Sequence, residues 1–199
     1  MPIDEHGHRG LYNHGRLPHF DHHSLFQAIT FRLADSLHPS RFVGNAPGKN
    51  MRDDPRAIFA GDDDLDTCYG NCWLRDPRVA DIVEGSLLHY DGERYLLLAW
   101  VVMPNHVHVL IAQRKGFPLA GIVRGWKSFT ARQANLVLGR SGSFWQLDYF
   151  DRFIRDQRHL HNVAEYIHEN PVKARLCRTA ADWKWSSYCR IAQRLEDVH

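Results

Sequence analysis

Two pairs of side chains in this sequence have the residue types and the spacing of a reaction centre. In the first pair, His106 and His108 flank Val107 in an apolar run. If that run is a strand, its side chains alternate, so both imidazoles lie on one face and the valine on the other. Imidazoles on an apolar strand are costly to desolvate unless something binds them, and a divalent metal is the natural partner. The alternative is a pair of surface histidines in a chain that holds 14 of them.

The second pair is Tyr166 and Asn170, which are followed directly by Pro171. On a helix, residues i and i+4 are neighbours, so a phenol nucleophile would lie beside an amide able to act as a third metal ligand. The alternative for Tyr166 is an ordinary half-buried aromatic residue. The alternative for Asn170 is an N-cap before proline at the first helical position, with a helix break at Asn170.

The elements that must position these pairs follow from the hydrophobic periodicity. Strands are predicted over residues 24–33, 94–103, 106–112 and 148–155, and helices over residues 76–89, 118–138 and 159–170. Asp76-Pro77 is typical of a helix start, and the short link between the second and third strands fits an antiparallel hairpin. A tail rich in tryptophan and serine follows the last helix.

The order of these elements predicts an α+β fold. The first six form a ferredoxin-like βαββαβ sheet with both crossover helices on one face, which leaves the other face open for a site. An added C-terminal helix carries the tyrosine. Residues 34–72 read as an irregular insertion after the first strand, because Gly, Pro and acidic residues dominate them. We therefore expect an N-terminal arm over residues 1–23 and one domain over residues 24–199.

The long helix over residues 118–138 is amphipathic. Its apolar face is expected to comprise Leu119, Ile122, Val123, Trp126, Phe129, Gln133 and Leu136, and its polar face Arg124, Lys127, Ser128, Arg132 and Asn135. No acidic residue occurs between Glu93 and Asp148. A stretch of one charge sign is an electrostatic footprint for a polyanion, and it favours nucleic acid as the partner. The alternative, in a protein of net charge +2, is a solvated face.

Composition sets outer bounds on the function. Hydrophobic residues make up 44% and charged residues 24% of the chain, as in ordinary globular proteins. There is no apolar run of the about 20 residues that span a bilayer and no signal-peptide pattern, so we expect a cytoplasmic protein without a membrane partner. Cys68 and Cys72 lack a second Cys/His pair at zinc-finger distance, so free thiols are expected rather than structural zinc.

Five segments together resemble one known family, the REP-associated tyrosine transposases. These are domesticated relatives of the single-strand insertion-sequence transposases, in the superfamily named for its His-hydrophobe-His motif. The segments are VVMPNHVHVLI, GWKSFTARQAN, FWQLDYFDRFIRD, YIHENPVKARL and WKWSSY, in that order. Together they cover residues 93–190 densely, and GRLPHF and ITFRL extend the resemblance towards the N-terminus.

The resemblance implies a role for each candidate residue. His106 and His108 fall on the family's two metal-ligand histidines, Tyr166 on its catalytic tyrosine, and Asn170 on the polar residue that completes the metal site. It further implies Mg²⁺ or Mn²⁺ as cofactor and single-stranded or hairpin DNA from repetitive extragenic palindromes as substrate, hence association with the nucleoid. The product would be a covalent 5′-phosphotyrosine, formed by a monomer or a homodimer.

DNA contacts are predicted at two places. Arg124, Lys127 and Arg132 would hold phosphates from the polar face of the long helix. The resemblance implies that the N-terminal arm, which contains Arg16, helps to read a short sequence at the foot of the hairpin.

Two rival functions remain open on the sequence. One is a hairpin-binding protein that keeps the fold without the reaction. The other is a zinc hydrolase that uses His106, His108 and a carboxylate such as Glu169, with water as the nucleophile.

Overall fold

The computed structural model describes residues 4–5, 7–14, 17–23, 25–36 and 69–196. Six strands and four helices lie in these ranges: β1 (Gly10–His14), β2 (Leu17–Asp21), β3 (Phe26–Arg32), α2 (Pro77–Leu88), β4 (Tyr95–Val102), β5 (His106–Gln113), α3 (Leu119–Val137), β6 (Phe150–Phe153), α4 (Gln157–Lys173) and α5 (Ser187–Glu196). Short 3-10 turns occur at Trp73–Arg75 and Ala180–Asp182. Most of the predicted insertion, residues 37–68, lies outside the described residues.

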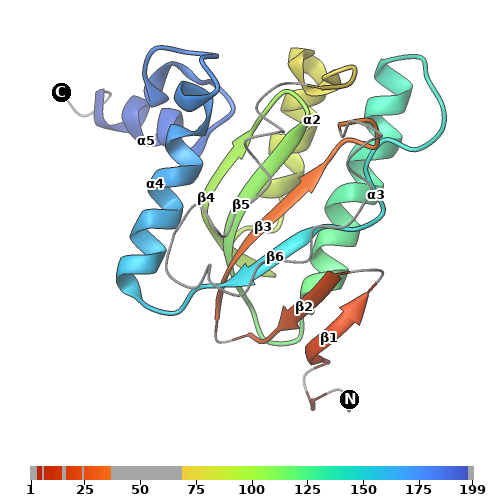
Figure 1. Ribbon diagram of the computed structural model, residues 1–199, viewed down its shortest axis with the longest axis vertical. Coiled ribbons are helices and arrows are strands. Elements are labelled where there is room, and N and C mark those ends of the chain that lie inside the picture. Colours follow the sequence, from red (N-terminus) through yellow and green to blue (C-terminus); the bar gives the residue numbers. More distant parts are fainter. Residues whose placement is uncertain (1–3, 6, 15–16, 24, 37–68, 197–199) are drawn as a thin grey trace.

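The central sheet has four antiparallel strands in the order β4-β5-β3-β6 (Figure 1). This strand order, with α2 between β3 and β4 and α3 between β5 and β6, is the ferredoxin-like βαββαβ arrangement. The predicted fold class is therefore confirmed. The strand predicted over residues 148–155 is shorter than expected, since only Phe150–Phe153 pairs with β3.

The two faces of the sheet are covered by different helices. Ile29 and Phe31 of β3, with Val107 and Val109 of β5, pack against α2 and α3 in the larger hydrophobic core. Alternate residues of the same strands, such as Leu110, pack against α4 in a second and smaller core. The second face is therefore less open than the sequence suggested, because α4 occupies part of it.

Helix α2 begins as predicted. Asp76 is its N-cap, and the carboxylate accepts a hydrogen bond from the backbone N–H of Arg78 at 3.0 Å, with Pro77 at the first helical position. This arrangement satisfies one of the donors that a helix start leaves unpaired. Buried residues of α2 include Val79, Val83 and Leu87, at helical spacing.

The buried face of α3 differs from the predicted one in its second half. Beyond Trp126 it continues through Thr130 and Ala134, whereas Phe129 and Leu136 are 45% and 72% exposed. Thr130 is accommodated in the core because its hydroxyl donates to the Trp126 carbonyl at 2.7 Å and accepts from the Trp145 indole at 2.9 Å. A satisfied hydroxyl and a small methyl group thus take the positions expected for larger apolar side chains.

Residues expected to form an irregular arm instead include the β1–β2 hairpin, which packs against β6. Asp21 at the end of β2 accepts hydrogen bonds from the ring of His8 at 3.0 Å and from the N–H of Leu119 at 3.2 Å. Asp21 thereby caps α3, whose own N-cap residue supplies no side-chain hydrogen bond. His19 forms a buried pair with Asp151 of β6.

The segment after α4 covers the outer edge of β4. Val102 donates its N–H to the Trp185 carbonyl at 2.9 Å, and Trp100 donates to the Ser187 hydroxyl at 3.1 Å. Pairing an edge strand in this way removes a template for aggregation. The tail then continues as α5, a helix that the sequence did not predict.

The described part of the chain bears on the cysteines and on membrane-spanning helices. Cys72, Cys177 and Cys189 are free thiols there, whereas Cys68 lies outside it. Within the same residues, none of the helices combines the length and the apolar character needed to cross a bilayer.

The revised face of α3 predicts a contrast between two leucines of one helix. Leu119→Ala should lower the free energy of unfolding by about 2–5 kcal/mol, because Leu119 is fully buried. Leu136→Ala, the control, should change it by less than about 0.5 kcal/mol. Urea denaturation followed by circular dichroism measures both free energies of unfolding. Equal losses in the two variants would mean that Leu136 is buried, as the sequence predicted.

Candidate active site

The candidate site begins with two histidines on one face of β5. His106 and His108 are both fully buried, and in the antiparallel register they lie opposite Arg32 and Thr30 of β3. The intervening Val107 points into the core under α2 and α3. The alternation expected from the His-Val-His pattern is therefore present, and both imidazoles project from the face that α4 partly covers.

The two imidazole rings point their Nε2 atoms at each other. These atoms are 3.0 Å apart, and each ring is held from behind at Nδ1. His106 Nδ1 lies 2.7 Å from the Asn105 amide oxygen, and His108 Nδ1 lies 2.8 Å from the Thr30 hydroxyl. Since an amide oxygen only accepts, His106 must carry its proton on Nδ1 and present a lone pair at Nε2. His108 presents the same lone pair when the Thr30 hydroxyl accepts its Nδ1 proton.

Burial keeps both rings neutral. Desolvation, assisted by the charge of Arg32, lowers the pKa of His106 to about 3. Desolvation and the neighbouring His106 lower the pKa of His108 well below its ordinary value. A neutral imidazole is the form that binds metal ions, so at neutral pH neither ring needs to lose a proton to act as a ligand.

Helix α4 brings a tyrosine and an amide to the same place. Its N-cap Asp156 accepts from the His159 N–H at 2.8 Å, and Val163 and Ile167 bury its apolar stripe against β4 and β5. One helical turn apart, Tyr166 and Asn170 then face β5. Asn170 is fully buried, with its amide nitrogen 3.4 Å from His108 Nε2.

The helix break anticipated at Asn170 is wrong, because α4 continues through Pro171 to Lys173. The Asn170 carbonyl accepts from the Ala174 N–H at 3.0 Å, and the Pro171 carbonyl accepts from the Leu176 N–H at 2.9 Å. Pro171 is itself buried. Tertiary packing thus overrides the local preference against a helical residue before proline, and it keeps Asn170 in register with Tyr166.

Tyr166 lies against the histidines of its own chain. Its ring centroid is 6.0 Å from that of His108 in an edge-to-face arrangement, and 8% of the residue is exposed. Lys173 holds its ammonium group 4.3 Å from the centre of the phenol ring, a cation–π contact from the next turns of the same helix. A phenol, an amide and two imidazoles therefore converge within a single chain.

The residues present fit a divalent metal ion. The Asn170 amide oxygen is buried and has no hydrogen-bond partner, which is costly unless a cation or a donor occupies the space beside it. No group of three His, Cys, Asp or Glu side chains suited to a metal occurs among the described residues, and the amide of Asn170 is the polar group that adjoins His108. Two imidazole nitrogens and one amide oxygen would leave coordination positions for substrate oxygens.

The predicted DNA contacts of the long helix are not brought to the histidines. Arg124 and Arg132 are exposed on α3, and α3 packs on the opposite face of the sheet. Lys127 donates to the carbonyls of Leu147 and Asp148 at 2.7 and 3.2 Å, and burial lowers its pKa to about 8. Arg16 lies outside the described residues.

Sequence reasoning missed the residues that orient the imidazoles. Asn105 belongs to the short link predicted between the second and third strands and Thr30 to the strand predicted over residues 24–33, and neither is among the predicted site residues. The available signal was positional, because Thr30 is the polar residue on the β3 face that the register pairs with His108. The metal-site role of such residues follows from the hydrogen bonds they make, which only the fold reveals.

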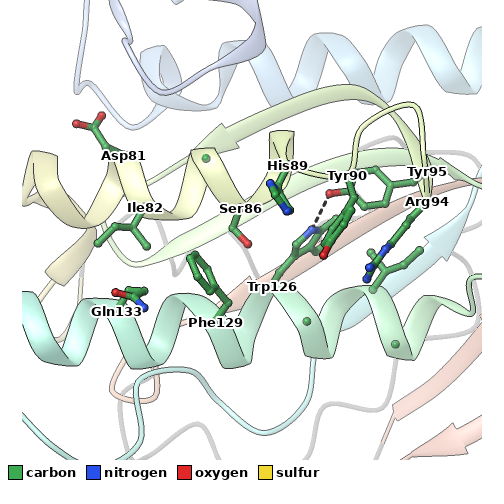
Figure 2. A pocket seen from close by; sticks show the side chains of 14 residues that line it. Asp81, Ile82, Ser86, His89, Tyr90, Arg94, Tyr95, Trp126, Phe129 and Gln133 are labelled. Atoms are coloured by element: carbon green, nitrogen blue, oxygen red, sulfur yellow. Dashed lines mark hydrogen bonds between the residues drawn. The ribbon is translucent and has the colours of Figure 1, made fainter.

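A cavity of about 660 Å³ lies elsewhere, between α2 and α3 (Figure 2). Phe129 and Trp126 extend into it from α3, and the Trp126 indole donates to the Tyr95 hydroxyl at 2.9 Å. Because α2 and α3 pack on the face that carries Val107, this cavity is separated from the histidines by the sheet.

Comparison with known proteins agrees with this geometry. Residues 77–170 match the model of the family described as IS200-like transposases, a range that includes all four site residues. A REP-associated tyrosine transposase of Haemophilus influenzae is 29% identical over 112 residues, which cover 51% of this chain and 62% of that protein. The chain thus spans less than two thirds of the length of this curated relative.

A solved structure has the same fold. It is a REP-associated tyrosine transposase bound to a REP hairpin, and it matches with a TM-score of 0.58 at 17% identity, over 91% of this chain and 87% of that one. The resemblance to the REP-associated tyrosine transposases noted from the sequence is confirmed.

The hydrogen bond behind His108 predicts an effect on metal affinity. Thr30→Val keeps the shape of the side chain but removes the hydroxyl that orients the ring, and should weaken Mn²⁺ binding by about tenfold or more. Titration calorimetry measures this affinity. Thr130→Val is the matched control, because it removes a buried hydroxyl on the opposite face of the sheet and should leave Mn²⁺ affinity unchanged. Equal affinities in wild type and Thr30→Val would exclude the orienting role.

Proposed function

We propose that this protein nicks and rejoins single-stranded DNA at repetitive palindromic hairpins, through a covalent 5′-phosphotyrosine on Tyr166. The observation that carries the proposal is the convergence of two neutral imidazoles, one buried amide and one phenol from a single chain. Similarity to the IS200-like transposases over residues 77–170 supports transposase activity as the class of reaction. The REP hairpin in the solved relative supports the choice of DNA substrate.

His106, His108 and Asn170 would hold a Mg²⁺ or Mn²⁺ ion. Such an ion supplies charge neutralisation at a phosphate oxygen when it is bound. Asn105 and Thr30 keep the two imidazoles aimed at the ion's position, and the burial of the rings keeps them unprotonated. The site is thus organised before substrate arrives, which avoids reorganisation during the reaction.

In the chemical step, the Tyr166 hydroxyl oxygen attacks the scissile phosphorus. The new bond joins the phenolic oxygen to phosphorus, and the bond from phosphorus to the 3′ oxygen breaks. The phenol loses its proton and the departing 3′ oxygen gains one, so the step is balanced without another reactant. Because the phosphotyrosine retains the phosphodiester linkage, a different 3′-OH can reverse the step and join a new strand without ATP.

Tyr166 lies beside the histidines of its own chain, so we propose that cleavage occurs in cis. The β1–β2 hairpin, which packs on β6, belongs to the proposed recognition arm. The zinc-hydrolase alternative receives less support from the geometry. The buried amide of Asn170 adjoins His108. The charge of Glu169 acts instead on Cys177, where burial, Asp182 and then Glu169 raise the pKa of the thiol.

The nucleophile is tested by removing one oxygen atom. Tyr166→Phe should abolish the denaturation-resistant protein–DNA adduct formed with a single-stranded repeat hairpin and Mn²⁺, because the ring remains and only the attacking atom is lost. Binding of the hairpin should change by less than about twofold. Tyr188→Phe is the matched control, since Tyr188 is an exposed residue of α5, and it should form the adduct normally. An adduct with Tyr166→Phe would assign the nucleophile elsewhere.

The metal ligand is tested by titration of activity against metal. His106→Ala should remove cleavage at every Mn²⁺ concentration, because a ligand and its lone pair are lost together. His89→Ala is the control, because His89 is exposed beyond the end of α2, and it should cleave at the wild-type rate. Undiminished cleavage by His106→Ala would exclude this residue as a ligand.

A further inference from the structure

Among the residues that the structure describes, no helix packs closely on one half of the site face. Helix α4 packs on β4 and β5, and it stands at the β4 side of the sheet in Figure 1. Strands β3 and β6 form the other half of the sheet. The side chains of this half that share a face with His106 and His108 follow from the register of the strands.

Three side chains of β3 and β6 determine the chemistry of this half of the site face. Arg32 is paired with His106 across the β3–β5 ladder. On the other side of β3, Phe150 is paired with Thr30 and Arg152 with Ala28. Because paired residues of neighbouring strands point to the same face, both arginines lie on the face of the histidines. The two histidines therefore adjoin a half-sheet that carries two cations.

Arg32 is held in place next to the metal site. Its guanidinium donates from Nε to the Gln146 side-chain oxygen at 2.8 Å, and its backbone carbonyl accepts from the Gln146 N–H at 2.9 Å. Its charge acts on His106, whose pKa it helps to lower. A guanidinium is a planar fork of donors suited to phosphate oxygens. Because the Arg32 guanidinium is fixed at Nε and lies adjacent to His106, its two terminal NH₂ groups can donate to a phosphate beside the proposed reaction centre.

Arg152 is a cation without a protein partner. It is half-buried, and within the described part of the chain its side chain makes no hydrogen bond or ion pair. Burial and the neighbouring Arg155 lower its pKa. The nearest acid along the strand, Asp151, points to the opposite face, where it pairs with His19. A partly desolvated and uncompensated guanidinium is unfavourable unless an anion binds it.

We propose that the β3–β6 half of the site face is the track for the substrate strand, with Arg32 on the scissile phosphate and Arg152 on a different phosphate. Arg152 is paired with Ala28, four residues from Arg32, which corresponds to about 13 Å along the strand, so the two arginines reach different phosphates. Phe150, half-buried between them, lies where an unpaired base can stack. This inference rests on the proposed function and deepens it.

The experiment compares this track with the cations of α3. Arg32→Gln and Arg152→Gln are the test variants, and Arg124→Gln and Arg132→Gln are matched controls from the opposite face of the sheet. Each protein is assayed with a hairpin carrying single-stranded flanks, for equilibrium binding over a range of salt concentrations and for the single-turnover rate of adduct formation at saturating protein.

The two test variants should fail in different ways. Arg32→Gln should lower the saturated rate of adduct formation by about 10²-fold with little change in binding, because its contact acts on charge at the reacting phosphate. Arg152→Gln should weaken binding and reduce the salt slope by about 1, while the saturated rate is retained. Both α3 variants should stay within about twofold of wild type. If the α3 variants lost DNA binding while Arg152→Gln kept it, the β3–β6 half would not be the track for the substrate strand.

A charge-neutral methylphosphonate at the scissile position isolates the role of Arg32. With this substrate, wild type and Arg32→Gln should react at rates within about threefold of each other, because the charge that Arg32 neutralises is absent. A persistent 10²-fold gap, or loss of Mn²⁺ affinity in Arg32→Gln, would overturn the assignment. With the unmodified hairpin, absence of an adduct in wild type would contradict the proposed function, whereas equally fast adduct formation by wild type and Arg32→Gln would defeat only this inference. The comparison of DNA binding between Arg152→Gln and the α3 variants tests the track whether or not an adduct forms.

Discussion

The structure depends on one close approach, that of two neutral imidazoles whose Nε2 atoms lie 3.0 Å apart in a buried setting. Each ring is fixed from behind, His106 by Asn105 in the link before β5 and His108 by Thr30 of β3. The antiparallel β3–β5 register is therefore a chemical requirement, because a slip of one residue would turn Thr30 away from His108.

The division of the sheet into two faces makes this site possible. Most of the large apolar side chains of β3 and β5 lie on one face of the sheet, where α2 and α3 cover them. The other face can then carry polar side chains, since only part of it packs under α4. Helix α4 contributes apolar residues to that packing and, one turn apart, the pair Tyr166 and Asn170. The same helix thus covers part of the site face and supplies its phenol and its amide.

Much of this arrangement could be predicted from the sequence, because strands and helix starts leave short-range signals. The alternation around Val107 and the cap at Asp76 are examples, and both are present in the structure. The continuation of α4 past Asn170 could not be predicted, because the local signal of Asn-Pro favours a break. Packing of a buried Pro171 decides the outcome, and packing is a property of the whole fold. Likewise, Thr130 enters the core through a hydrogen bond to a distant indole.

Charge was the least informative signal, for a physical reason. The acid-free stretch that contains Arg124 and Arg132 marks a run of sequence, but the sheet separates those side chains from the histidines. Arg32 and Arg152 belong to different segments of the chain, and only strand pairing brings them to the face of the site. A phosphate responds to charges near it in space and, at the Debye length of about 8 Å in physiological salt, hardly to others. The field at the site is therefore set by strand pairing rather than by the count of cations along the sequence.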